Sequence, residues 1–236
     1  MIYHEWHSRT GLGTAHELVL ELVPEGSWVL DLGCSSGYLA QAIVDRRASR
    51  VLGVEVDSSA SQLARSLGLE VVDGSLMDRQ VLATLAARGP FDVVVAADVL
   101  EHLANWEALL DWIRQDVLAV DGRLIASIPN VANYTIRKQL VIGRFDYADR
   151  GILDNTHVRF FTAESIRLAL RRHQFTVEEW RVAADTFPLD RFFRVSRALR
   201  SGKRLMNRWL LAWFPNLVAF QFVLSARPTQ SAPSDH

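Results

Sequence analysis

Short apolar runs alternate with amphipathic segments along the first 130 residues of the chain. Five runs have the length of strands: 28–32, 51–56, 69–73, 91–97 and 122–129. Four segments repeat apolar residues at helical spacing: 14–23, 58–67, 76–87 and 103–120. We expect Ser58 to cap the second of these helices. The alternation of strand and helix predicts an α/β fold with a doubly wound, mostly parallel sheet and right-handed crossovers.

The pattern changes after residue 130. A helix over 134–142 is followed by the long irregular stretch 143–161, and stretches of that length are usually lids or binding loops. We therefore interpret 130–161 as a lid or acceptor loop. Thr162 is placed to cap a helix that ends near His173. Two more strands are predicted, 177–182 and an antiparallel edge strand over 217–226, which brings the sheet to seven strands.

The chain is expected to form one domain over residues 1–227. Residues 1–23 are interpreted as an N-terminal arm followed by the first helix, and the arm either folds over a ligand or is a frayed terminus. A helical insertion, 187–214, precedes the last strand, and 228–236 is expected to be a disordered tail.

The segment 28–37, Trp-Val-Leu-Asp-Leu-Gly-Cys-Ser-Ser-Gly, predicts a strand, a tight turn and the start of a helix. Glycine fits a turn in which the backbone adopts positive φ or passes close to a ligand, and Gly33 and Gly37 are placed for this. A helix that begins at Gly37 directs amide hydrogens and a partial positive charge at a ligand above the turn.

The spacing of the glycines separates two classes of cofactor. A dinucleotide fingerprint requires glycine at positions 33, 35 and 38, and only Gly33 matches. The pattern Asp-x-Gly-x-Gly-x-Gly belongs to Rossmann-like methyltransferases that bind S-adenosylmethionine, and Ser35 is the only departure from it. Glu55, at the end of the second strand, is placed to accept both hydroxyls of a ribose.

Composition narrows the class of protein. The chain has 236 residues, is 49% hydrophobic and carries a net charge of -1, so it is a globular protein with no bulk attraction to nucleic acid. The single cysteine, Cys34, excludes an internal disulfide and a cysteine-based metal site, and a small buried residue is a better interpretation of it than a nucleophile. Without a signal-peptide core or an apolar run long enough to span a membrane, a cytoplasmic location is expected.

Four motifs in order resemble one family. They are Phe-Asp-Val-Val-Val-Ala-Ala-Asp-Val-Leu-Glu-His-Leu at 91–103, Ser-Ile-Pro-Asn-Val-Ala-Asn at 127–133, Gly-Arg-Phe-Asp-Tyr at 143–147, and Gly-Ile-Leu-Asp-Asn-Thr-His-Val-Arg-Phe-Phe-Thr at 151–162. With the glycine turn, they resemble the class I S-adenosylmethionine-dependent methyltransferases over the first 182 residues. Within that family the chain is similar to a bacterial subgroup associated with glycosyltransferases of surface polysaccharide synthesis. The resemblance implies methylation of a hydroxyl on a sugar or glycan intermediate.

The resemblance also implies which residues hold the cofactor. Asp31 and the backbone of 33–37 would hold the methionine end, Glu55 the ribose, and Asp98 would lie beside the sulfonium. Where the family has Gly-Asp after the third strand, this chain has Gly74-Ser75, so Ser75, the backbone of Leu76, Asp73 and Asp78 all remain open as contacts of adenine. The expected cofactor-binding residues are Asp31, Gly33, Cys34, Ser35, Gly37, Glu55, Val56, Ser75, Leu76 and Asp98.

A hydroxyl acceptor benefits from a base, and His157 is the candidate because imidazole titrates near neutral pH. Asp154 could orient the His157 ring if that turn is helical. A structural role for His157 in locking the loop is the alternative. For Glu101 and His102, capping and packing are at least as good an explanation as contact with a substrate. No metal is expected, because the sequence places no further ligands near Asp154 and His157.

The insertion carries a basic series with apolar residues between its members: Arg191, Arg194, Arg197, Arg200, Lys203, Arg204 and Arg208. Such a segment, over 191–213, could contact an anionic membrane surface or a phosphorylated, lipid-linked sugar. A cap packed on its own domain with its arginines in water is the preferred alternative. Two other functions stay open: an N- or C-methyltransferase of another small molecule, and a non-catalytic module that binds S-adenosylmethionine.

Overall fold

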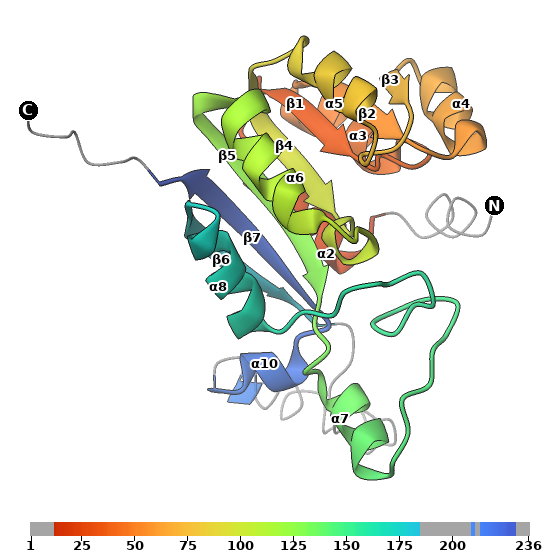
Figure 1. The fold of residues 1–236 in the computed structure, drawn as a ribbon, viewed down its shortest axis with the longest axis vertical. Helices are drawn as coiled ribbons and strands as arrows, with labels where there is room; N and C mark the ends of the chain where they lie inside the picture. The colour runs from red at the N-terminus through yellow and green to blue at the C-terminus, as the bar shows by residue number, and fades with distance from the viewer. Residues whose placement is uncertain (1–11, 185–208, 211–212, 230–236) are drawn as a thin grey trace, which may run out of the picture.

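The protein folds around one seven-stranded sheet in the order β3-β2-β1-β4-β5-β7-β6 (Figure 1). The computed structural model describes residues 12–184, 209–210 and 213–229. β7 runs antiparallel to both of its neighbours, β5 and β6, and the remaining neighbouring strands are parallel. The predicted mostly parallel, Rossmann-like sheet with an antiparallel last strand is therefore confirmed.

The strands are β1 (Trp28–Leu32), β2 (Arg50–Glu55), β3 (Glu70–Asp73), β4 (Phe91–Ala97), β5 (Leu118–Pro129), β6 (Phe175–Ala183) and β7 (Gln221–Pro228). The helices are α2 (Thr14–Leu22), α3 (Tyr38–Arg47), α4 (Ser58–Ser66), α5 (Arg79–Ala86), α6 (Trp106–Trp112), α7 (Tyr134–Val141), α8 (Ala163–Arg172) and α10 (Pro215–Val218). A 3-10 turn, η1 (Leu100–His102), and a π-helical turn, η2 (Ile113–Val117), complete the described elements.

Helices cover both faces of the sheet and bury two apolar clusters. On one face α2, α3 and α4 pack on residues such as Val29, Val51 and Val93. On the other face α5, α6 and α8 pack on the alternate positions of the same strands, such as Leu30 and Val94. Because successive side chains of a strand point to opposite faces, strands covered on both sides are apolar throughout, as the sequence of β4 is.

The crossover after β1 lies on the opposite face from the helix that follows β4, although these two strands are neighbours. Such a switch point leaves an opening between the carboxyl ends of the two strands, which is where open α/β sheets bind their ligands. α7 and the irregular stretch 142–161 extend beyond this edge of the sheet (Figure 1).

Several predicted boundaries are wrong for local reasons. Asp57, not Ser58, caps α4, because its carboxylate accepts hydrogen bonds from the amides of Ser59 and Ala60. The third helix begins at Arg79 instead of 76, because Asp78 caps it. The helix expected over 103–120 comprises only α6 and η2, since Leu118 already pairs with Phe91 in the sheet.

The last strand also differs from its prediction. Residues 217–218 belong to α10, β7 begins at Gln221, and Pro228 is the last residue of β7 rather than part of a tail. The prediction of an edge strand is also wrong, because β7 lies between β5 and β6, and β6 is at the edge. By contrast, Thr162 caps α8 as predicted, in a reciprocal capping box with Ser165.

Three predicted features fall outside the described residues: the arm over 1–11, most of the insertion 187–214 with its basic series, and the tail from 230 onward. Membrane contact through 191–213 therefore stays a prediction. Among the described ranges, no helix is both long and apolar enough to cross a membrane.

Candidate active site

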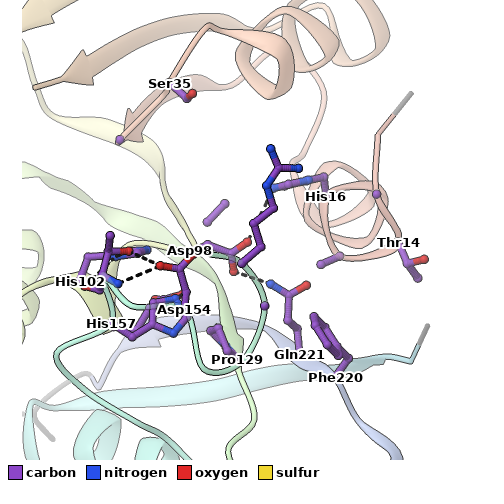
Figure 2. Close-up of a pocket in the computed structure, with 18 of the residues that line it drawn as sticks. Thr14, His16, Ser35, Asp98, His102, Pro129, Asp154, His157, Phe220 and Gln221 are labelled. Carbon is purple, nitrogen blue, oxygen red and sulfur yellow. Dashed lines mark hydrogen bonds and ion pairs between the residues drawn. The ribbon is translucent and has the colours of Figure 1, made fainter. Parts of the chain in front are cut away.

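A cavity of about 520 Å³ lies at the carboxyl ends of β1, β4 and β5. Its wall combines the start of α2, the glycine turn, the end of β4 with η1, the end of β5, the loop 150–157 and the start of β7. Figure 2 shows Ser35 of the glycine turn across the cavity from the group of His102, Asp154 and His157. The sheet edge therefore brings together residues from six separate parts of the chain.

The turn after β1 has the backbone geometry that the sequence predicts. Gly33 and Gly37 have φ of 67° and 82°. A Cβ on Gly37 would lie 2.5 Å from Leu69 Cδ1 and 2.9 Å from Ala64 Cβ, so glycine is required for α3 to pack closely against α4. Ser35 takes the left-handed conformation at φ 50°, which shows how the turn accommodates a Cβ at the position of the missing glycine.

Several amides of this turn bond within the protein. The amide of Cys34 donates to the Val54 carbonyl at 3.0 Å, and the amide of Gly37 donates to the Cys34 carbonyl at 2.9 Å. The amide of Ser35 donates to Glu55 Oε2 at 2.9 Å. The sequence predicts amides that are free to bind a ligand, but these three amides are already bonded. The turn therefore contributes the shape of its backbone to a binding site rather than these three hydrogen-bond donors.

Cys34 has a structural place in the turn. Its side chain is buried, and its Sγ would lie 2.5 Å from a Cβ on Gly53 of the neighbouring strand. Burial raises the pKa of the Cys34 thiol, with the charges of Asp31 and Glu55 adding to the effect. A thiol held neutral in this way is not a nucleophile, as expected from the sequence.

Two carboxylates lie at the carboxyl ends of the first two strands. Asp31 is 2% exposed, and no described residue makes a hydrogen bond to its Oδ2. Burial, together with the charge of Glu55, raises the pKa of Asp31 to about 7. Glu55, in contrast, is well bonded: Oε1 accepts from the amides of Val56 and Asp57 at 2.8 Å each, and Oε2 accepts from Ser35.

The residues considered for adenine separate into two pairs. Asp73 is engaged by Arg65 at 2.6 Å and by the Ser61 hydroxyl at 2.5 Å, and Asp78 caps α5. Ser75 and Leu76 lie in the turn after β3, and neither forms an ion pair or caps a helix. The Ser75 hydroxyl accepts a hydrogen bond from the Met77 amide at 3.1 Å. The structure thus leaves Ser75 and Leu76 as the better candidates.

Asp98 is the centre of a polar group on the cavity wall. It takes a left-handed φ of 56°, and its Oδ1 accepts from Ser127 Oγ at 2.8 Å and from Gln221 Nε2 at 2.6 Å. Its Oδ2 lies 3.9 Å from His16 Nε2, which in turn lies 3.2 Å from the Tyr38 hydroxyl. Burial lowers the pKa of His16, and the charge of Asp98 opposes that shift. The sequence analysis missed His16 and Gln221, which have no motif of their own.

Glu101 and His157 face one another deeper in the wall. The Glu101 side chain is 1% exposed, and neither of its carboxylate oxygens has a hydrogen-bond partner among the described residues. Burial, with the charges of Asp98 and Asp154 adding to it, raises the pKa of Glu101 well above its ordinary value. Its Oε1 lies 4.0 Å from His157 Nε2. Burial lowers the pKa of His157, so its imidazole is neutral at neutral pH.

Asp154 does not orient the His157 ring, contrary to the prediction. His157 Nδ1 lies 3.1 Å from the Ile152 carbonyl, whereas the Asp154 carboxylate accepts from the amide and the hydroxyl of Thr156 at 2.8 and 2.6 Å. Burial raises the pKa of Asp154, but the two hydrogen bonds from Thr156 outweigh it and bring the pKa below its ordinary value. The Thr156 hydroxyl also lies 3.1 Å from His102 Nδ1, so Asp154 acts on His102 through Thr156.

Of the predicted site residues, the cavity brings together Gly33, Ser35, Asp98, Asp154 and His157. Asp31, Cys34, Gly37, Glu55, Val56, Ser75 and Leu76 lie outside its wall, at or just beyond the carboxyl ends of β1, β2 and β3. The expectation that no further ligand atoms lie near His157 is wrong, because Glu101 and His102 lie beside it. Glu101 and His102 are 55 or more positions away from His157 in the chain, so the sequence does not indicate that they lie beside it.

Comparison with known proteins identifies the fold and the family. A model of a methyltransferase domain family matches residues 6–179. The chain belongs to this methyltransferase family. A crystal structure of an S-adenosylmethionine-dependent methyltransferase from Archaeoglobus fulgidus has the same fold, with a TM-score of 0.62 at 16% identity, over 96% of this chain and 99% of that one. The cofactor is S-adenosylmethionine, as predicted from the glycine turn.

Two curated relatives match parts of the chain. The bifunctional methionine biosynthesis protein MetXA/MetW of Rhodopirellula baltica is 32% identical over 152 residues, which are 58% of this chain and 23% of that protein. A ubiquinone biosynthesis O-methyltransferase of Idiomarina loihiensis is 38% identical over 89 residues, which are 36% of this chain and 35% of that protein. The chain thus spans about a quarter to a third of the length of these relatives.

The residues at the sheet edge fit the cofactor. The methionine end of S-adenosylmethionine carries an ammonium group, and Asp31 offers a buried carboxylate oxygen to which no described residue donates a hydrogen bond. Gly33 and Ser35 form part of the cavity wall, which allows the backbone to approach a ligand closely. Glu55 has used three of about four acceptor positions, so at least one remains for a ribose hydroxyl.

Proposed function

We propose that the protein transfers the methyl group of S-adenosylmethionine to a hydroxyl group of a small molecule, a sugar or glycan intermediate. One observation carries this proposal: the turn that fits the cofactor and a group of polar side chains with three histidines, His16, His102 and His157, line a single cavity. A hydroxyl must lose its proton when its oxygen is methylated, and neutral imidazoles next to carboxylates are suited to assist that loss.

For the cofactor, we assign the methionine ammonium to Asp31, the ribose to Glu55, and the adenine to Ser75 and Leu76 with the exposed Val56 beside them. Asp98, at the carboxyl end of β4, is assigned to the neighbourhood of the sulfonium. The bound cofactor supplies a methyl group on a positively charged sulfur. The chain's own contribution is to align the acceptor with that group and to exclude water.

For the acceptor, we assign the part of the cavity between Asp98 and His157. Asp98, His16, Gln221 and Thr156 line this part with hydrogen-bonding groups, as a ligand with several hydroxyls requires. His157 and Glu101 are assigned to the activation of the hydroxyl. The name of the Idiomarina relative, an O-methyltransferase, supports oxygen as the methylated atom, and the four motifs of 91–162 support a glycan-related acceptor.

Calorimetric titration with S-adenosylmethionine tests the cofactor half of the proposal. We expect binding to the unmodified chain, and weaker binding to Asp31→Ala and Glu55→Ala. Asp121→Ala, at the amino end of β5, is the matched control and should bind as the unmodified chain does. Equal affinity in all four proteins would reject the assigned cofactor residues.

Incubation with methyl-labelled cofactor tests the acceptor half. The panel contains nucleotide sugars, lipid-linked glycans, phenols, and amines as nitrogen acceptors. Label on a sugar hydroxyl supports the proposal. Transfer to amines or carbon acceptors alone would support the alternative methyltransferase, and binding of the cofactor without transfer to any member would favour a non-catalytic module.

A further inference from the structure

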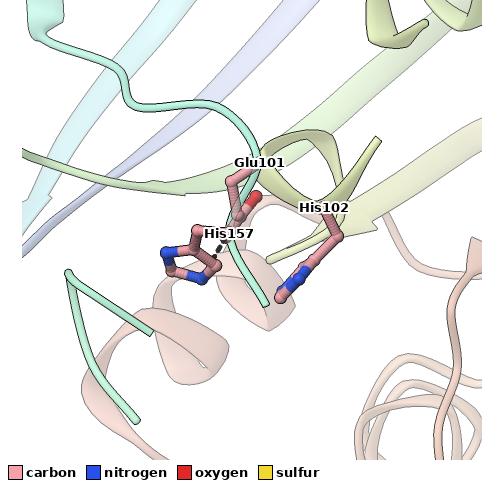
Figure 3. Close-up of side chains that lie close together, drawn as sticks. All are labelled: Glu101, His102 and His157. Atoms are coloured by element: carbon pink, nitrogen blue, oxygen red, sulfur yellow. Dashed lines mark ion pairs between the residues drawn. The ribbon is translucent and has the colours of Figure 1, made fainter. Parts of the chain in front are cut away.

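Glu101, His102 and His157 form a compact group in the cavity wall. The proposed function assigns a role to Glu101 and His157 but none to His102. Glu101 and His102 come from η1, and His157 comes from the loop between α7 and α8. One ligand atom from each lies within 4.8 Å of the other two (Figure 3). The backbone joins the two segments here, because the Glu101 carbonyl accepts hydrogen bonds from the amides of Val158 and Arg159 at 2.9 and 3.0 Å.

The burial of the carboxylate is the second observation. Glu101 is 1% exposed, yet neither oxygen has a hydrogen-bond partner among the described residues. A buried carboxylate without partners is unfavourable, and such groups in proteins are usually paired, hydrogen-bonded or bound to a metal. A ligand cation bound to Glu101 would supply the missing partner, and the two imidazoles beside Glu101 place further ligand atoms around the same point.

The hydrogen bonds of the two histidines direct the correct nitrogen toward a ligand. His157 Nδ1 lies 3.1 Å from the Ile152 carbonyl, which only accepts, so Nδ1 carries the proton and Nε2 keeps a free lone pair. His102 Nδ1 lies 3.3 Å from the Thr156 carbonyl and 3.1 Å from its hydroxyl. That hydroxyl donates to Asp154, so it too accepts from His102.

Both histidines are therefore held as the tautomer with the proton on Nδ1. Metal-binding histidines in proteins show the same arrangement, in which one ring nitrogen donates to a backbone carbonyl or a carboxylate system and the other binds the ion. Thr156 and Asp154 supply this arrangement for His102, and Ile152 supplies it for His157.

We propose that Glu101, His102 and His157 bind one divalent first-row transition-metal ion in the wall of the acceptor cavity. Two imidazoles and one carboxylate are typical of Zn²⁺, Mn²⁺ and Fe²⁺ sites, and three protein ligands leave positions open for a substrate. Around an ion with ligands at about 2.1 Å, the ligand atoms lie about 3 to 3.5 Å apart. His102 is exposed, and we expect its side chain to move toward the other two ligands when the ion binds.

The charges around the group also suit a cation. Three carboxylates and one guanidinium line the cavity, those of Asp98, Glu101, Asp154 and Arg150, which is a formal charge of −2 when all are ionised. One divalent ion neutralises this charge, so the ion and the sulfonium can share the cavity without net repulsion.

This inference rests on the proposed function and states how the hydroxyl is activated. The acceptor oxygen occupies an open position on the ion, which makes its hydroxyl more acidic. As the oxygen forms its bond to the methyl carbon, the bond from that carbon to sulfur breaks and its electron pair stays on sulfur. The hydroxyl proton leaves to water at the cavity mouth. His157 then acts as a metal ligand and not as the group that takes the proton.

Metal binding is tested first without cofactor or acceptor, so that the result does not depend on methyl transfer. The full chain, without a polyhistidine tag and stripped by a chelator, is titrated with Zn²⁺ by calorimetry and with Co²⁺ by visible absorption. We expect one ion per chain, visible bands that report histidine ligands, and weaker binding of Mg²⁺. Absence of Zn²⁺ and Co²⁺ binding would overturn the inference.

Variants identify the ligands. Glu101→Gln, His102→Ala and His157→Ala should each weaken Zn²⁺ binding by about 100-fold. His173→Ala is the matched control: His173 also lies beside two carboxylates, Asp111 at 2.9 Å and Glu107 at 3.9 Å, but outside the cavity, and its removal should change nothing. Unchanged thermal melting and cofactor binding show that each variant is folded. An ion lost in His173→Ala but kept in the other three would overturn the inference.

Thr156 gives a test that a merely structural role would not pass. Thr156→Val keeps the shape but removes the hydroxyl between Asp154 and His102, so it should weaken Zn²⁺ binding by about tenfold and alter the Co²⁺ bands. Thr156→Ser restores the hydroxyl and should restore both readouts. No difference between these two variants would remove Thr156 and Asp154 from the site.

Methyl transfer separates this inference from the proposed function. Once an acceptor is found, stripped protein should lose transfer, and Zn²⁺ or Mn²⁺ should restore it. Full transfer by stripped protein would overturn the role of the ion while the proposed function stands. Metal binding without transfer to any acceptor would leave the ion site in place and reject the proposed function.

Discussion

Two buried carboxylates, Asp31 and Glu101, have the same electrostatic problem and different surroundings. We assign Asp31 to the part of the site that binds the cofactor, called the cofactor half, and Glu101 to the part that binds the acceptor, called the acceptor half. In the described structure Asp31 has one carboxylate oxygen without a hydrogen-bond partner and Glu101 has two, and burial raises the pKa of each. Asp31 neighbours Glu55, which backbone amides already satisfy, whereas Glu101 faces two imidazoles. The first setting suits an ammonium group that brings its own hydrogens, and the second suits an ion that accepts lone pairs.

The comparison shows that an unfavourable buried charge can mark a binding site without saying what binds. The neighbours decide the ligand: Glu101 forms a group with His102 and His157 whose ligand atoms lie within 4.8 Å of one another, and among the described residues no such group includes Asp31. If this is correct, replacing each carboxylate by its amide should impair one function and not the other: Asp31→Asn the binding of the cofactor, and Glu101→Gln the transfer of the methyl group.

Replacement of the carboxylate in the acceptor half should have the largest effect. Glu101→Gln removes the negative ligand but keeps its shape, and we expect methyl transfer to fall by about 1000-fold, or about 4 kcal/mol in the barrier. Binding of S-adenosylmethionine should change by less than about twofold, because Glu101 makes no hydrogen bond or ion pair with the described residues assigned to the cofactor. Single-turnover transfer of label and calorimetry measure the two quantities. Transfer within tenfold of the unmodified chain would contradict the assignment.

Replacement of the carboxylate in the cofactor half should weaken the binding of S-adenosylmethionine and leave the metal site intact. Asp31→Asn is expected to raise the Kd for S-adenosylmethionine by about 30-fold, the value of one charged hydrogen bond in a buried site. The affinity for Zn²⁺ should stay the same. Calorimetry with each ligand measures both affinities, and Asp121→Asn serves as the control. A parallel loss of both ligands would show that the two halves are not independent.

The two halves also differ in how far the sequence reveals them. The strand, turn and helix at 28–47 depend on local contacts, so Asp31, Gly33 and Gly37 are recognisable from their spacing alone. Glu55 follows in the same way from the next strand. The alternation of elements was equally sufficient for the mostly parallel sheet, whereas the antiparallel last strand was predicted at the edge and lies between β5 and β6.

The acceptor half could not be predicted to the same extent, because it depends on contacts between distant segments. His16 meets Asp98, Gln221 meets Asp98, and Glu101 meets His157 only after the sheet has formed. Sequence reasoning found His157 but assigned its orientation to Asp154, the nearest acid in the chain. The carbonyl of Ile152, which orients the ring, carries no sequence signature.

The close packing of the glycine turn predicts an effect on stability. Gly37→Ala places a Cβ at 2.5 Å from Leu69 Cδ1 at positive φ, and should destabilise the fold by about 3 kcal/mol. Gly68→Ala has a similar φ of 87° but no atom within 4 Å, so strain alone should cost about 1 kcal/mol. Urea unfolding compares the two variants. Equal loss in both would show that close packing at Gly37 is not what requires glycine.

The smallest expected effect is a pH dependence of cofactor binding that belongs to Asp31 alone. The pKa of Asp31 is raised from 3.8 to about 7, so the folded protein holds this carboxyl protonated below about pH 7 and ionised above it. Only the ionised form attracts the ammonium group of the cofactor. The affinity for S-adenosylmethionine should therefore fall as the pH falls below about 7, by up to about tenfold for each pH unit. Stability without cofactor should change in the opposite sense: between about pH 4 and pH 7 the unfolded chain has lost a proton that the folded chain keeps, so this group's contribution to stability declines as the pH rises. Asp31→Asn should abolish the pH dependence of the affinity and reduce that of the stability, to which the raised pKa of Glu101 also contributes, whereas Glu101→Gln should leave the cofactor titration curve unchanged. A curve that keeps its slope in Asp31→Asn would assign the titration to another group and would remove the electrostatic basis for placing the ammonium at Asp31.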